Sequence, residues 1–186
     1  MARHGRDPAD DPSGGTLLVN AGKTQVKGID LLARFAFGRA VVLAAGATFL
    51  DLKSKSLTVP ASLLPYLAVQ AVPFNLVAKT TVTAGARFTL PAPESFGKTV
   101  LSVDFYHSSK VQVSDVTLPS YDLVSARLDV NNIGGSGFDA SVFARNLFDK
   151  QYLTSGNVSS NVLGLSSAFY GTPRTYGVEL RFRFGG

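Results

Sequence analysis

Few residues in this chain could carry out metal or nucleophilic chemistry. The sequence contains no cysteine and two histidines, His4 and His107, which are far apart along the chain. Disulfide bonds, cysteine nucleophiles and histidine-rich metal centres are therefore excluded. No serine lies in the glycine-rich pattern of a nucleophile elbow. We therefore expect no catalytic residues, no cofactor-binding residues and no metal ligands, with His107 as an interfacial or surface residue, and a protein that is not an enzyme.

One glycine-rich segment matches a nucleotide-binding pattern by its letters alone. Residues 135–140 read GSGFDA, which fits G-x-G-x-x-A. A dinucleotide site needs a helix directly after these glycines, because the helix N-terminus binds the pyrophosphate. Here a segment with a period of two follows, which is typical of a strand. The glycines therefore indicate a tight turn.

The charges do not predict a polyanion partner. The chain has 18 Lys and Arg against 13 Asp and Glu, a formal net charge of +5. A nucleic-acid footprint is a concentrated basic patch. Here the basic residues are spread over most of the chain and alternate with acids, so we expect no nucleic-acid partner.

The elements that carry these charges have the period of a β-strand. At the C-terminus Val178, Leu180 and Phe182 alternate with Gly177 and Glu179, and the same pattern returns between turn signals along the chain. It predicts an all-β, antiparallel meander of about seven strands. The predicted strands are residues 16–37, 40–53, 74–90, 98–110, 121–131, 138–147 and 174–184.

The aromatic residues indicate which face of this sheet is wet. On the apolar face, rings such as Phe37 and Phe182 fall near one set of strand ends, and Phe49 and Phe105 fall near the other. Aliphatic residues fill the middle. Two aromatic girdles around an aliphatic band are typical of a barrel wall that faces lipid. We expect lipid contact from Ile29, Leu31, Leu43, Val82, Val103, Leu128, Val142, Val178 and Leu180, and a lumenal position for Arg87, Arg127, Arg145 and Glu179.

The connections between the predicted strands alternate strictly in length. Residues 38–39, 91–97 and 132–137 form links of 2, 7 and 6 residues, and residues 54–72, 111–120 and 149–171 form links of 19, 10 and 23. This order places the short links at one rim and the long links at the other, as in outer-membrane barrels. We expect substrate contact from the three long links, because long loops on a rigid scaffold commonly carry recognition.

The N-terminal segment differs from the rest of the chain. Residues 1–15 are charged, contain two prolines and have no apolar stretch. They lack the features of a secretory signal peptide and read as a flexible tail. The longest uncharged stretches are broken by prolines or by polar residues, so no helical membrane span is expected.

Four stretches of the sequence resemble one known family. Residues 146–152 (NLFDKQY) and 170–178 (YGTPRTYGV) are similar to segments near the end of TonB-dependent outer-membrane receptors, residues 179–184 (ELRFRF) to their terminal strand, and residues 20–30 (NAGKTQVKGID) to a strand further upstream. The stretches occur in the family's order, so the resemblance covers residues 16–186.

The resemblance implies a fold and a function. The family fold is a barrel of about 22 strands that encloses a plug domain, and residues 16–186 would be a partial barrel domain of seven strands with the plug absent. The intact receptor would lie in the outer membrane, in contact with its lipid. It would take up a scarce nutrient such as a ferric siderophore, and TonB would act only through the missing plug. We expect the chain alone, without a signal peptide, to form an open sheet with free edges at residues 16–37 and 174–184 and to transport nothing.

Two other interpretations remain open. A soluble lipocalin-like barrel that binds a small ligand would suit the length, and it would turn the apolar face inward. A small, complete outer-membrane barrel would need an even number of strands and an export signal. Detergent dependence of the purified protein would separate the first from a membrane protein.

Overall fold

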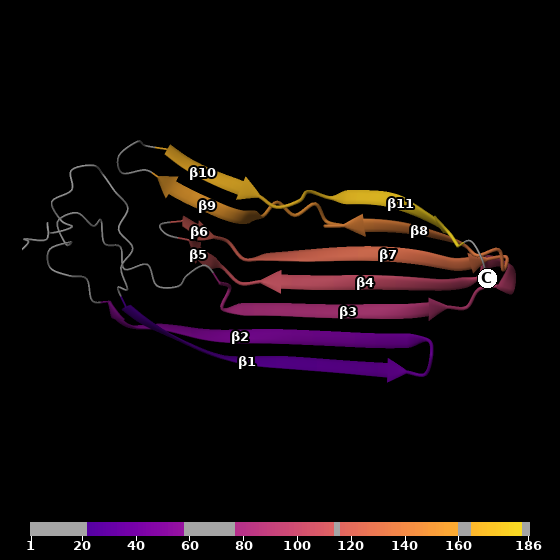
Figure 1. The fold of residues 1–186 in the computed structure, drawn as a ribbon, viewed down its shortest axis with the longest axis horizontal. Coiled ribbons are helices and arrows are strands. Elements are labelled where there is room, and N and C mark those ends of the chain that lie inside the picture. The colour runs from indigo at the N-terminus through magenta and orange to yellow at the C-terminus, as the bar shows by residue number, and fades with distance from the viewer. Residues whose placement is uncertain (1–21, 58–76, 114–115, 160–164, 184–186) are drawn as a thin grey trace, which may run out of the picture.

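Seven long strands form a single antiparallel sheet. The computed structural model describes residues 22–57, 77–113, 116–159 and 165–183. The sheet has the order β1-β2-β3-β4-β7-β8-β11, and each strand pairs antiparallel with the next (Figure 1). The predicted all-β, antiparallel fold is confirmed. The strands are β1 (Gly22–Phe37), β2 (Val41–Leu57), β3 (Thr80–Leu90), β4 (Lys98–Ser108), β7 (Tyr121–Ile133), β8 (Phe138–Arg145) and β11 (Thr175–Phe182).

Two of the predicted long links contain strands of their own. Residues 111–120 hold a hairpin of β5 (Val111–Val113) and β6 (Val116–Leu118). Residues 149–171 hold a second hairpin of β9 (Leu153–Ser159) and β10 (Leu165–Tyr170). The prediction of links without strands is wrong here. Strands of three residues are too short to show alternation, and the Ser, Asn and Gly content of the second link is typical of loops.

The predicted boundaries need two further corrections. β2 continues to Leu57 and thus takes up the start of the predicted link 54–72, whose residues 58–72 lie outside the described residues. β3 begins at Thr80 instead of residue 74. The pairing becomes irregular before Thr80. Leu50 N still donates to Lys79 O at 2.8 Å, but residues 77–79 are not in a strand. The predicted tail, residues 1–15, also lies outside the described residues.

The short connections lie at one end of the sheet and the long ones at the other. In Figure 1 both hairpins lie at the same end, opposite the turns that follow β1, β3 and β7. The turn before β4 needs glycine at position 97, where φ is 74° and a Cβ atom would lie 2.2 Å from Asn131 O. In the described part of the chain, no helix is long and apolar enough to cross a membrane.

The register separates the residues into two faces, as the alternation predicts. Leu128 pairs with Val142, which pairs with Val178, and these residues share the apolar face. Arg87 pairs with Ser102, which pairs with Arg127 on the other, polar face. Within each pair both side chains point to the same side of the sheet, so the pattern continues from strand to strand.

The apolar face is not covered by any described part of the chain. Among the described residues, only Val100 and Leu118 are buried hydrophobic residues, whereas Ile29 is 62% exposed and Val178 is 68% exposed. A soluble domain of this size would bury such residues in a core. A continuous apolar surface of this kind needs a partner that is itself apolar.

The polarity of the two faces inverts within β1 and β2. The last apolar pair on the apolar face is Ile29 with Phe49, and the next pair on that face is Lys27 with Asp51. On the polar face, the neighbouring pair Val26 with Leu52 is apolar. The apolar band therefore ends between Phe49 and Asp51, and β1 and β2 continue beyond it.

The sheet is open. β1 and β11 are its first and last strands, and neither has a second partner among the described strands. Each therefore presents one edge of unpaired backbone groups, which is where another strand can pair. The open arrangement agrees with the expectation of a partial barrel.

Neighbouring positions in β11 test which face contacts lipid. We expect a bimane label on Val178→Cys to be quenched strongly by lipids with brominated acyl chains, because Val178 lies on the exposed apolar face. The same label on Glu179→Cys, one residue further on the opposite face, is the control and should be quenched weakly. The measurement is bimane fluorescence of the protein reconstituted in vesicles. Stronger quenching at position 179 would mean that the faces are reversed.

Candidate functional site

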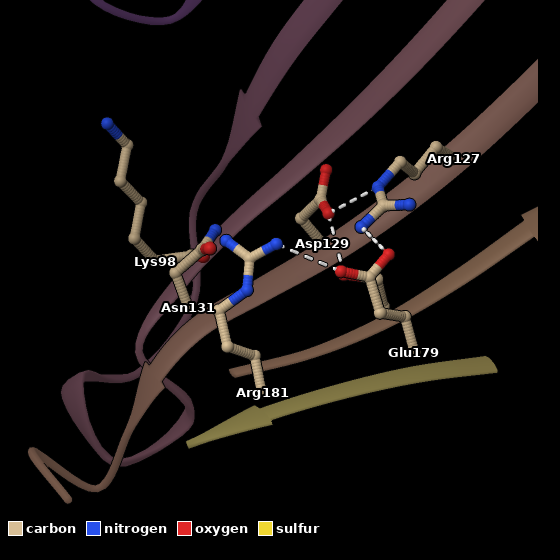
Figure 2. Close-up of polar contacts among 7 residues, drawn as sticks. Lys98, Arg127, Asp129, Asn131, Glu179 and Arg181 are labelled. Carbon is tan, nitrogen blue, oxygen red and sulfur yellow. Dashed lines mark hydrogen bonds and ion pairs between the residues drawn. The ribbon is translucent and has the colours of Figure 1, made fainter. Parts of the chain in front are cut away.

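Charged residues of β7 and β11 form a connected network on the polar face. Arg127 Nε lies 2.7 Å from Asp129 Oδ1, and Arg127 Nη2 lies 3.0 Å from Glu179 Oε2. Arg181 Nη2 contacts the other oxygen of Glu179 at 3.1 Å. Ser141 of β8 donates its Oγ proton to Asp129 Oδ1 at 2.7 Å. Figure 2 shows Arg127 between the two carboxylates, and we call these five residues the polar-face network.

The register explains why these residues meet. Asp129 is paired with Ser141, and Ser141 is paired with Glu179, so the three lie in one row across β7, β8 and β11. On the same face, Arg127 lies two residues before Asp129 in β7, and Arg181 lies two residues after Glu179 in β11. A second pair nearby joins Arg183 Nη2 and Asp139 Oδ1 at 2.6 Å.

The network forms a polar wall with balanced charge. Each of its acids contacts at least one arginine, and the side chain of Arg127 is 35% exposed. Ion pairs this accessible to water contribute about 0–1 kcal/mol each. Within the described residues, no group of three His, Cys, Asp or Glu side chains could hold a metal ion. The arrangement suits a hydrated surface.

The NLFDKQY segment ties the two ends of the longest connection together. Asn146 is 6% exposed, and its Nδ2 donates to Lys150 O at 2.9 Å and to Thr172 O at 3.1 Å. Its Oδ1 accepts from Lys150 N at 2.8 Å. Asp149 Oδ1 accepts from Arg174 N at 3.0 Å. The motif therefore holds the chain before β9 beside the chain after β10.

Two residues of this segment have positive φ angles, 49° for Asn146 and 54° for Asp149. Asn and Asp adopt this conformation more readily than other non-glycine residues, because their short polar side chains can bond to the nearby backbone. Here the side chains do so. The motif thus has a structural role at the base of the long connection.

Three tyrosines lie where β4 and β7 meet the base of the β9–β10 hairpin. The rings of Tyr121 and Tyr152 are stacked with centroids 4.4 Å apart, and Tyr106 lies 6.0 Å from Tyr121. Gly171 packs against Tyr152, since a Cβ atom at position 171 would overlap the ring. We call Tyr106, Tyr121 and Tyr152 the tyrosine cluster. Sequence reasoning missed it, and the one available signal was Tyr152 at the end of the NLFDKQY motif.

The two hairpins in the long connections pack against each other. A Cβ atom on Gly156 of β9 would lie 3.1 Å from Val116 Cγ1 of β6, and Leu118 of β6 is 5% exposed. The structure thus brings together the predicted substrate-contact segments 111–120 and 149–171. Most of the third segment, residues 54–72, lies outside the described residues, and nothing here tests contact with a substrate.

His107 belongs to the apolar face at the end of β4 that lies near the hairpins. Its Nδ1 lies 2.7 Å from Asp122 Oδ1, and the two residues are paired across β4 and β7. The side chain of His107 is 31% exposed and that of Asp122 is 61% exposed. This pair is a local cross-strand contact near the end of the apolar band.

Solved structures with the same fold include an uptake receptor and a siderophore receptor. The chain resembles the ferric yersiniabactin uptake receptor FyuA from Yersinia pestis with a TM-score of 0.73 and 17% identity, over 89% of this chain and 24% of that one. For the siderophore receptor PiuA from Acinetobacter baumannii, the TM-score is 0.62 with 20% identity, over 86% and 21%. For FpvAI, in its complex with pyocin S2, it is 0.59 with 16% identity, over 83% and 18%.

These similarities establish the fold. The chain spans about a quarter or less of the length of the receptors that it matches. No protein-family model matches the chain, and no curated protein sequence matches it. The resemblance to TonB-dependent receptors that the motifs predict is therefore confirmed at the level of the fold.

Replacing Asn146 tests the structural role of the motif. Asn146→Ala should lower the free energy of unfolding by about 1–3 kcal/mol, because it removes three hydrogen bonds made by a buried side chain. Asn131→Ala is the control, since Asn131 makes one exposed bond, from Nδ2 to Lys98 O at 3.2 Å, and should change stability little. Urea unfolding of the protein in detergent micelles measures both. Equal effects would contradict the proposed role of Asn146.

Proposed function

We propose that this chain is the C-terminal part of the barrel of a TonB-dependent outer-membrane receptor, and that the intact receptor takes up a scarce nutrient such as a ferric siderophore. The observation that carries the proposal is a sheet of seven antiparallel strands with an uncovered apolar face and with its long connections gathered at one end. The four sequence motifs and the receptors of the same fold support the same identity.

The parts of the described structure fit separate tasks in such a receptor. The apolar face would contact outer-membrane lipid, and the polar-face network would line the lumen. The hairpins β5–β6 and β9–β10, packed against each other at one end, would stand at the outer rim where a nutrient is captured. TonB would act on a plug domain, as the resemblance implies. This role needs no catalysis by the chain.

The two alternative interpretations require features that the described strands lack. A lipocalin-like barrel closes on itself and packs its apolar residues inside. In the described residues the sheet is open, and its apolar face includes residues as exposed as Tyr176, at 80%. A small, complete outer-membrane barrel would also be closed. Both alternatives therefore fit less well than a segment of a larger barrel.

Uptake by cells tests the proposed function. In the native host under iron limitation, deleting the gene should abolish uptake of at least one radiolabelled ferric siderophore, and restoring the gene should recover it. Deleting the gene for TonB should have the same effect, because the energy for uptake comes through TonB in this family. Fractionation should place the intact protein in the outer membrane. A soluble, detergent-independent protein would contradict the proposal.

The hairpin and the opposite turn offer a matched pair of variants. Shortening the β9–β10 hairpin in the intact receptor should remove most of the uptake, because this hairpin would stand at the outer rim. Replacing turn residues 134–136, at the other end of the sheet, should leave uptake near the wild-type level. The measurement is the initial rate of uptake at equal receptor levels in the membrane. Equal losses for both variants would count against substrate capture by the hairpin.

A further inference from the structure

A small pocket lies at the end of the sheet where β2 continues past the start of β3. It has a volume of about 300 Å³ and lies between β2, the residues before β3 and the β5–β6 hairpin. Leu52 and Val77 give it an apolar side, and Lys79 and Lys110 are its charged residues. No residue of the polar-face network or of the tyrosine cluster lines it, so the pocket is separate from both.

The register places the two lysines opposite each other. Antiparallel pairing of β3 with β4 continues to the bond that Ser109 N donates to Thr80 O at 2.9 Å. Thr80 N in turn donates to Ser109 Oγ at 3.0 Å. One residue further along, the same register brings Lys79 opposite Lys110. The two lysines therefore directly follow the hydrogen-bonded pair of Thr80 and Ser109.

The charges of these lysines are not neutralised by acids of the described residues. None of the ion pairs there includes Lys79 or Lys110, and no carboxylate lines the pocket. Like charges on directly opposite residues of a sheet are destabilising. The arrangement therefore favours an anion that binds both ammonium groups and relieves their repulsion.

The position of the pocket indicates that the anion comes from solution. Leu50 N donates a hydrogen bond to Lys79 O, and the register places the two residues on the same face of the sheet. Leu50 and Leu52 lie on the polar face of β2, opposite to Phe49. Lipid would contact the opposite face. The apolar band has also ended at this level, because Asp51 follows Phe49 on that face.

We propose that Lys79 and Lys110 bind a carboxylate or similar anionic group of a soluble molecule whose apolar part contacts Leu52 and Val77. The inference rests on the proposed function and deepens it, because the molecule would be the captured nutrient or its chelator. A volume of about 300 Å³ lies at the lower end of the range of small-molecule sites, so the pocket has room for an anionic group and the carbon atoms beside it.

Binding of citrate, a soluble carboxylate probe, tests the inference without measuring transport. Lys79→Gln with Lys110→Gln should weaken citrate binding to the intact receptor in neutral detergent by about tenfold or more, the scale of a lost charge-assisted hydrogen bond. Lys79→Arg with Lys110→Arg should retain binding within about threefold, because the charges remain. Isothermal titration calorimetry measures the affinities, and the heat-dependent gel mobility of each variant shows that it is folded.

The matched control removes two positive charges from the same end of β2, at residues that do not line the pocket. Lys53→Gln with Lys55→Gln should change citrate affinity by less than about twofold, because neither lysine lines the pocket. Equal losses in the two double variants would overturn the inference. The inference would also be overturned if lipid A in the micelles, but not citrate, protected Lys79 and Lys110 from a reagent that acetylates lysine. Either result would leave the uptake experiments unaffected, so the two proposals fail separately.

Discussion

Continuous backbone pairing is the constraint on which the rest of this structure depends. Where a sheet faces hydrocarbon, no water can satisfy an unpaired N–H or C=O group, and each such group costs several kcal/mol. Within the described sheet, each strand between β1 and β11 pairs on both sides, and unpaired edges remain only on the outer sides of β1 and β11. The pairing also fixes the side-chain pattern, because a slip of one residue would move Val178 to the polar face and Glu179 to the apolar face.

The same pairing makes the polar-face network and the outer rim possible. Asp129, Ser141 and Glu179 meet because three strands hold them in one row. The long connection after β8 can carry a hairpin because Asn146 joins its two ends, so that the hairpin begins from a defined base. The long sheet and the hairpins are therefore separate parts of the described chain, and the motif lies at the junction between them.

Much of the fold could be predicted from the sequence because alternation shows directly on which face of a strand each residue lies. The pattern of Val178, Leu180 and Phe182 identifies a strand and its apolar face without any knowledge of its neighbours. The register cannot be obtained in this way, since it depends on which residue lies opposite on another strand. The contact between Arg127 and Glu179 and the stacking of Tyr121 on Tyr152 were therefore not predictable. The short strands of β5 and β6 were missed for a related reason, because three residues cannot establish a period.

The change of polarity along β1 sets the length of its apolar stretch, which can be compared with the thickness of a membrane. Its apolar outward residues run from Ile29 to Phe37, a length of about 27 Å at about 3.4 Å per residue. A barrel strand tilted by about 40° would cover about 20 Å of bilayer depth with this stretch. If the hydrocarbon layer extended as far as the next pair on this face, Lys27 and Asp51 would lie in hydrocarbon, where charged side chains are unfavourable. In the proposed receptor, this stretch would therefore suit a thin membrane, and the bacterial outer membrane is thinner than the average bilayer.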